Sequence, residues 1–258
     1  MSAPVIDNSP MMMRQLLVFA IVCWASAFAQ DGDIYAADEY PNPFFDTQAC
    51  GRGTQRSYIC DPSFILKAEE AQQLEALLGI IRNETACPCA DHYCNAAHPG
   101  YKIGIALVKK IAPSNPMKTG EDEKDPSFVI QQNLEKSSLF AYTLLKRWQM
   151  GACGEDVIIL YSVVDNVFYT ITGEVAEKKL TASMIGDISM NTREMFRPST
   201  AFEGLLSLVK QYQAVFMGRY KQPDYRLTMP EAQAVRSHAG FVLPSLLALL
   251  MGLLVAVH

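Results

Sequence analysis

The chain has 258 residues, half of them hydrophobic, and a formal net charge of −5 at pH 7. This length accommodates one well-cored domain with tails, and the sequence contains no internal repeat or low-complexity tract. A net negative charge without a basic stripe excludes a nucleic-acid-binding protein.

Residues 1–29 have the pattern of a secretory signal peptide. A short basic segment precedes an apolar stretch, and Ala27-Phe28-Ala29 then forms an A-x-A cleavage pattern. We therefore expect the mature chain to begin at Gln30 and to enter the secretory pathway. Residues 30–57 are rich in Asp, Pro, Gly and aromatic side chains without any period, which predicts an extended N-terminal arm.

Six of the seven cysteines lie beyond the signal peptide. An even number of cysteines in an oxidising compartment predicts three disulfides, and fifteen connectivities are open. A metal site is the alternative for the segment CPCADHYCNAAH, but its spacing lacks the paired C-x2-C of common zinc folds, which favours disulfides. Two of the cysteines are close enough in sequence to close a local loop, namely Cys50 and Cys60. The others are Cys87, Cys89, Cys94 and Cys153.

The first helix is predicted over residues 65–82. Leu74, Leu77, Leu78 and Ile81 recur at helical spacing and form one apolar face. The sequon Asn83-Glu84-Thr85 follows directly, so we expect Asn83 to be glycosylated on a solvent-facing surface.

A β-branched strand is predicted over residues 103–111, followed by an acidic loop without EF-hand spacing. A second amphipathic helix is predicted over residues 127–149, where Leu134, Ala141, Leu145 and Trp148 recur at helical spacing and should face the core. Two strands then follow over residues 156–164 and 167–175. The first is continuously apolar, as in the centre of a sheet, and Asp165-Asn166 between them predicts a tight hairpin.

Two further helices are predicted over residues 176–188 and 198–216. The order is therefore α-β-α-β-β-α-α. A strand, a helix and a second strand imply a parallel crossover, so we expect an α/β layered domain with a mixed β-sheet and helices packed on it.

This succession of segments, over about residues 58–217, resembles the TPM domain, and specifically its cysteine-bearing animal branch, the modulator of levamisole receptor family. Residues 61–70 look like the helix-opening D-x-x-x-x-L-S-x-E-E pattern, and residues 155–160 look like the D-N-G-V-L-L-L segment before the central strand. Two departures matter. Lys67 replaces the usual capping Ser, and Asp156-Val157 replaces Asn-Gly, which puts any ion or catalytic role of that motif in doubt.

The resemblance implies an extracellular TPM-like domain, here residues 58–221, that acts as an auxiliary subunit of a levamisole-type nicotinic acetylcholine receptor. Its partners would be the receptor subunits. Some TPM proteins of plants and bacteria are phosphatases, so a phosphatase-like hydrolase is the alternative, and a structural or adhesive ectodomain is a third.

The residues themselves do not favour an enzyme. The sequence has no P-loop, G-x-S-x-G, H-E-x-x-H or C-x5-R motif. Asp61, Asp156 and Asp165 are the candidate metal-binding carboxylates. Each also has a purely structural explanation, because Asp61 lies in a predicted turn, Asp156 at a predicted strand start and Asp165 in the predicted hairpin. We therefore expect no catalytic residue, metal or cofactor.

The C-terminal residues 239–258 are almost entirely apolar, and as a helix the run from residue 240 to 257 would extend about 27 Å, enough for a bilayer core. We expect a membrane anchor behind a stalk of residues 222–238, with the ectodomain outside the cell. A transmembrane helix and a glycosylphosphatidylinositol signal are both open. The absence of a basic residue after the run argues against a transmembrane helix, and Ala232-Gln233-Ala234 suits lipid attachment. The spacer of residues 235–240 is short for a lipid signal and contains Arg236, and the family resemblance implies a spanning helix.

Overall fold

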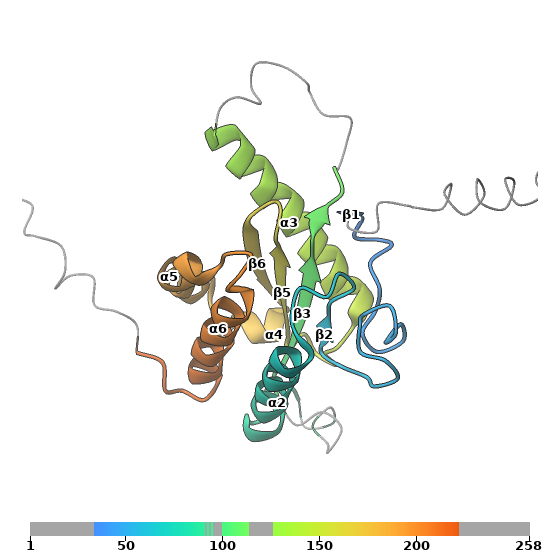
Figure 1. The fold of residues 1–258 in the computed structure, drawn as a ribbon. Coiled ribbons are helices and arrows are strands. Elements are labelled where there is room, and N and C mark those ends of the chain that lie inside the picture. The colour runs from blue at the N-terminus through green and yellow to red at the C-terminus, as the bar shows by residue number, and fades with distance from the viewer. Residues whose placement is uncertain (1–33, 91, 93, 95–99, 114–125, 222–258) are drawn as a thin grey trace, which may run out of the picture. The chain divides into compact units, whose positions relative to one another are not determined.

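A computed structural model describes residues 34–90, 92, 94, 100–113 and 126–221 (Figure 1). The predicted signal peptide, the predicted acidic loop, the stalk and the C-terminal anchor lie outside these residues. Within the described part of the chain, no helix is both long enough and apolar enough to cross a membrane.

The centre of the fold is a four-stranded mixed sheet in the order β2-β3-β5-β6. Strands β2 (Ile59–Cys60), β3 (Lys102–Val108) and β5 (Asp156–Ser162) run parallel, and β6 (Val167–Thr172) pairs antiparallel with β5. All seven residues of β3 and all seven of β5 are buried. Strands that are buried along their whole length and apolar except at their ends fit a sheet that is covered on both faces, so the predicted mixed α/β fold is confirmed.

Helices cover the two faces of the sheet unequally (Figure 1). Helix α2 (Ala68–Glu84), helix α5 (Ala182–Thr192) and helix α6 (Ala201–Phe216) pack on one face, where Ile159 of β5 joins their core. Among the helices that the structure describes, α3 (Pro126–Trp148) is the one on the other face, where it packs with the arm against Ile158 and its neighbours. Successive residues of a strand point to opposite faces, so β5 contributes to both cores.

The N-terminal arm packs against the domain in its described part. Strand β1 (Ile34–Tyr35) pairs parallel with β4 (Lys110–Ile111) as a separate two-stranded sheet. Tyr40 is fully buried, and its hydroxyl lies 2.9 Å from the carbonyl oxygens of both Cys60 and Leu107. The arm is therefore held by a buried side chain.

The structure refines several predicted boundaries. Strand β5 ends at Ser162, so the hairpin connection is residues 163–166 rather than two residues, and Asn166 takes the left-handed φ of 49° that asparagine tolerates. The helix predicted over residues 176–188 is divided into α4 (Glu174–Glu177) and α5, because the hydroxyl of Thr181 accepts a hydrogen bond from the Met184 amide and begins a new helix.

Helix α3 also extends past the β5–β6 hairpin at its N-terminal end (Figure 1). Asn133 donates to the Asp165 carbonyl oxygen of this hairpin at 3.1 Å, so Leu134, which its helical spacing places on the core face, lies at the end of the sheet and is exposed. A single-turn 3-10 helix, η3 (Arg193–Met195), connects α5 to the segment before α6.

Candidate functional site

The six cysteines outside the predicted signal peptide form three disulfides, which confirms that prediction. Cys50 pairs with Cys60 and joins the arm to β2, while Cys87 pairs with Cys94. Cys89 pairs with Cys153, across 64 residues of sequence. Both sulfurs of this last bond lie near the Glu155 carboxylate, the one grouping of potential metal ligands among the described residues. Sulfur in a disulfide is not a thiolate, so this grouping is not a metal site.

Asp61 follows β2 and fixes the turn that leads into α2. Its carboxylate accepts hydrogen bonds from the amides of Ile65 at 2.9 Å and Leu66 at 2.8 Å. Burial raises the pKa of Asp61, and these two amides oppose that effect. The side chain is therefore occupied by backbone groups.

Lys102 and Glu155 form a buried ion pair that the sequence did not predict. Glu155 also accepts hydrogen bonds from the amides of Ala152 at 2.9 Å and Cys153 at 2.8 Å. Burial alone would raise the pKa of Glu155, but the bonds from Lys102 and from the amides outweigh it and lower that pKa. The available signal was a lysine at the start of an otherwise apolar strand.

Asp156 begins β5 beside this pair. Its carboxylate accepts a hydrogen bond from the Gly151 amide at 3.2 Å, and it is buried. Burial raises the pKa of Asp156, and the Gly151 amide opposes the rise. The carboxylate thus holds the loop that precedes β5.

Asp165 lies in the β5–β6 connection and fixes β4 to it. Its carboxylate accepts hydrogen bonds from the Ile111 amide at 2.8 Å and the Ser162 hydroxyl at 2.6 Å, and it pairs with Lys136 of α3 at 3.4 Å. Three groups from three elements, namely β4, β5 and α3, meet at this carboxylate, which makes it a structural junction.

The three candidate aspartates do not converge. Asp156 lies at the start of β5 and Asp165 beyond its end, so about 20 Å of strand separates them. Each carboxylate is already bound to the protein's own backbone amides. In the described residues, this arrangement stabilises loops and offers no shared site for a metal or a reacting substrate.

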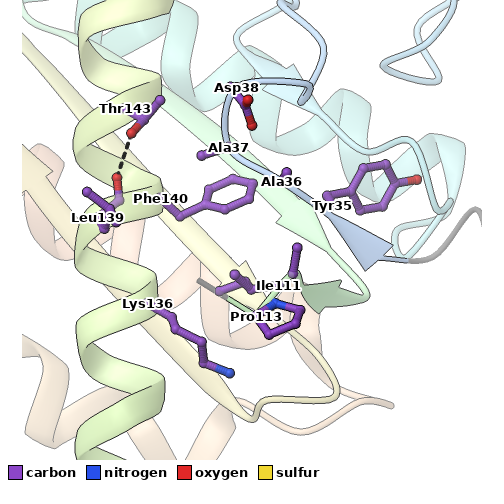
Figure 2. A pocket seen from close by; sticks show the side chains of 11 residues that line it. Tyr35, Ala36, Ala37, Asp38, Ile111, Pro113, Lys136, Leu139, Phe140 and Thr143 are labelled. Carbon is purple, nitrogen blue, oxygen red and sulfur yellow. Dashed lines mark hydrogen bonds between the residues drawn. The ribbon is translucent and has the colours of Figure 1, made fainter. Parts of the chain in front are cut away.

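A recess of about 280 Å³ lies between the arm and α3 (Figure 2). Figure 2 shows the Phe140 ring extending from the helix toward Ala36 and Ala37 of the arm. Arg147 of α3 holds the arm in place, donating to the carbonyl oxygens of Ala37 at 2.6 Å and Tyr40 at 2.8 Å. This recess was not predictable from the sequence, because it forms only when the arm folds back onto the helix.

An apolar ridge on α3, formed by Leu139 and Tyr142, borders the recess. Leu139 is 56% exposed and Tyr142 is 50% exposed. Leu139 lines the recess on one side and, on the other, a second hollow of about 440 Å³ beside Tyr169 of β6. Leu139 and Tyr142 lie three residues apart on the helix, so their exposed side chains form a small apolar surface that another protein can cover.

Asn83 lies in the last turn of α2 and is exposed. Its modification stays a prediction. The exposed position leaves room for a glycan on the solvent side of the helix.

Comparison with known proteins gives two family matches. Residues 35–166 match the family described as modulator of levamisole receptor-1, and residues 121–215 match the TPM domain. No curated protein matches the sequence. The solution NMR structure of the N-terminal domain of a protein from P. gingivalis is similar, with a TM-score of 0.46 and 15% identity, and the match covers 72% of this chain and 93% of that chain.

The first of these matches spans just over half of the chain and contains the arm, all three disulfides and the α3 ridge. The family is named for the modulation of a receptor and not for a catalytic activity, in agreement with the prediction that the chain is not an enzyme. The chain belongs to the modulator of levamisole receptor-1 family.

Proposed function

We propose that this protein is a membrane-anchored extracellular auxiliary subunit that increases the response of a levamisole-type nicotinic acetylcholine receptor to its agonist. The observation that carries the proposal is the family match over residues 35–166. The protein acts by contact with receptor subunits, without turnover of a substrate.

The chemistry of the domain supports an extracellular location. Three disulfides lock the arm, the segment after α2 and the loop before β5, and such bonds persist in oxidising compartments. The predicted signal peptide of residues 1–29 would deliver the chain there. The apolar residues 239–258 would then hold it on the membrane, as a transmembrane helix or as a glycosylphosphatidylinositol signal.

The α3 ridge is the surface that we assign to the receptor. Leu139 and Tyr142 lie within the family-matched residues, and the arm recess and the hollow beside β6 flank them. An exposed leucine and tyrosine bordered by concave surface can insert between the side chains of a partner and exclude water there. The ridge gives the ectodomain a contact surface that does not involve the buried aspartates.

The test is agonist-evoked current from a levamisole-type receptor in oocytes, recorded alone, with the full chain, and with a chain that stops after Ser237. We expect the full chain to increase the current and the truncated, secreted chain to have little effect. An anchor raises the local concentration of the domain beside the channel, and the truncated chain lacks that advantage.

The outcomes separate the alternatives. No change in current with the full chain at the cell surface would overturn the proposal and leave a structural or adhesive role. Equal increases with both chains would show that the domain modulates the receptor but that the tail contributes nothing. Release of the full chain by phosphatidylinositol-specific phospholipase C would identify the lipid anchor, and resistance would identify the transmembrane helix.

A further inference from the structure

An open hollow of about 1000 Å³ lies at the end of the β5–β6 hairpin, on the face covered by α5 and α6. Its wall comes from the end of β5, the start of β6, η3 and the residues after it, together with Ile130 of α3. It is separate from the arm recess and contains none of the three candidate aspartates. A volume of this size accommodates a small organic ligand.

The wall of the hollow is aromatic. Phe168 of β6 stacks on Phe196 with ring centroids 4.1 Å apart, and Tyr161 of β5 lies 5.2 Å from the same Phe196 ring. Ile130 adds an aliphatic side chain that is 60% exposed. These groups suit the apolar body of a ligand, because its binding removes apolar surface of both the ligand and the wall from water.

One buried polar group in this wall lacks a partner among the described residues. Tyr161 is fully buried, and its hydroxyl makes no hydrogen bond within the described residues. The other large buried tyrosines differ, since Tyr212 bonds the Thr170 hydroxyl at 2.9 Å and Tyr40 reaches two carbonyl oxygens. Buried hydroxyls are normally paired, so the exception marks a position where a ligand atom completes the bond.

The rim of the hollow carries positive charge. Arg193 and Arg197 both line it, against one carboxylate, Glu194, which pairs with Arg193 at 3.2 Å. Arg197 is exposed, and its guanidinium has no partner among the described residues. A guanidinium presents a planar fork of donors that matches a carboxylate.

We propose that this hollow binds a small amphipathic carboxylate, whose apolar body packs on Phe168 and Phe196 while its carboxylate accepts hydrogen bonds from Arg197 and from the Tyr161 hydroxyl. The site is independent of the receptor contact on α3. Burial raises the pKa of Tyr161, which keeps the hydroxyl protonated and therefore a donor at neutral pH.

The test is ligand-observed NMR with the full chain in lipid nanodiscs, with 4-phenylbutyrate as the probe and 4-phenylbutanol as its uncharged counterpart. We expect the acid to bind and the alcohol to bind at least tenfold more weakly, because the alcohol forms no charge-assisted bond. Empty nanodiscs provide the correction for partition into lipid.

Three variants locate the binding. Arg197→Gln should weaken the acid about tenfold, and Tyr161→Phe should weaken it several-fold, since each removes one donor. Arg219→Gln, which changes an exposed arginine outside the hollow, should leave the affinity unchanged. Equal binding of acid and alcohol would overturn the assignment of a carboxylate. No binding, or binding that Arg197→Gln and Tyr161→Phe leave intact, would overturn the site itself.

Discussion

Lys102 and Glu155 form an ion pair whose side chains are only 2% and 1% exposed. Lys102 begins β3 and Glu155 directly precedes β5, and the Lys102 amide also donates to the Glu155 carbonyl oxygen at 3.3 Å. The pair therefore joins the starts of the two central parallel strands to the loop that contains Cys153.

Removing one partner of this ion pair should destabilise the fold strongly. Lys102→Met leaves a buried, unpaired carboxylate, and we expect it to lower the free energy of unfolding by about 3–5 kcal/mol. The double variant Lys102→Met with Glu155→Leu should recover part of that loss, since it buries no charge. Urea denaturation measures both, with the exposed Lys110→Met as the control. A single variant as stable as the wild type would show that the pair is not buried.

The buried carboxyl of Asp156 predicts a specific pH dependence. Because burial raises its pKa in the folded protein above the ordinary 3.8, the folded state binds this proton more tightly than the unfolded state. The contribution of Asp156 to stability therefore falls as pH rises from the ordinary value through the raised one. Asp156→Asn keeps an acceptor for the Gly151 amide but removes the titration.

The Asp156→Asn variant should therefore be more stable relative to the wild type at pH 7 than at pH 3.5. Its free energy of unfolding minus that of the wild type should be larger at pH 7. Thermal denaturation at the two pH values measures this difference. A difference that is constant with pH, or that reverses, would show that the Asp156 pKa is not raised.

Most of the fold was predictable because its signals are local. The apolar period of α2 and the continuous apolar runs of β3 and β5 indicate a helix and buried strands directly. The division of the helix predicted over residues 176–188 was missed because it depends on one capping side chain, Thr181. The exposure of Leu134 was missed for a different reason: helical spacing does not say where the sheet beneath a helix ends.

The site was less predictable because its contacts are remote in sequence. The sequence indicates Asp61 and Asp165 as candidate metal-binding carboxylates, and it predicts a turn at Asp61 and a hairpin at Asp165. It could not show that Asp165 binds the amide of Ile111, 54 residues away. The arm recess and the hollow near Tyr161 likewise combine segments that only the tertiary structure brings together.

Two buried tyrosines should respond oppositely to loss of the hydroxyl. Tyr161→Phe removes a hydroxyl without a partner, so we expect the free energy of unfolding to stay the same or to rise. Tyr212→Phe removes the bond to Thr170 and should cost about 1 kcal/mol. Chemical denaturation of both variants gives the comparison. A clear loss of stability in Tyr161→Phe would indicate a partner for its hydroxyl within the protein.

The disulfides should contribute according to the length of chain that they close. Cys89–Cys153 spans 64 residues and Cys87–Cys94 spans 7. Loop-closure entropy then makes the longer bond more stabilising by about 2 kcal/mol. The paired serine replacements of each bond, compared by urea denaturation under non-reducing conditions, test this order. Equal losses of stability in the two variants would show that the longer bond does not stabilise the protein by restricting the unfolded chain.

The α3 ridge should determine the effect on receptor current. Leu139→Asp places a charge at the centre of the proposed contact, and the loss of a central apolar contact should weaken receptor binding on the order of 30-fold. Met190→Asp on α5 is the matched control, because Met190 is also 56% exposed but lies on the opposite face of the sheet. With equal amounts of each variant at the oocyte surface, Leu139→Asp should abolish most of the increase in current and Met190→Asp should preserve it. The reverse result would move the receptor contact to the face of α5 and α6.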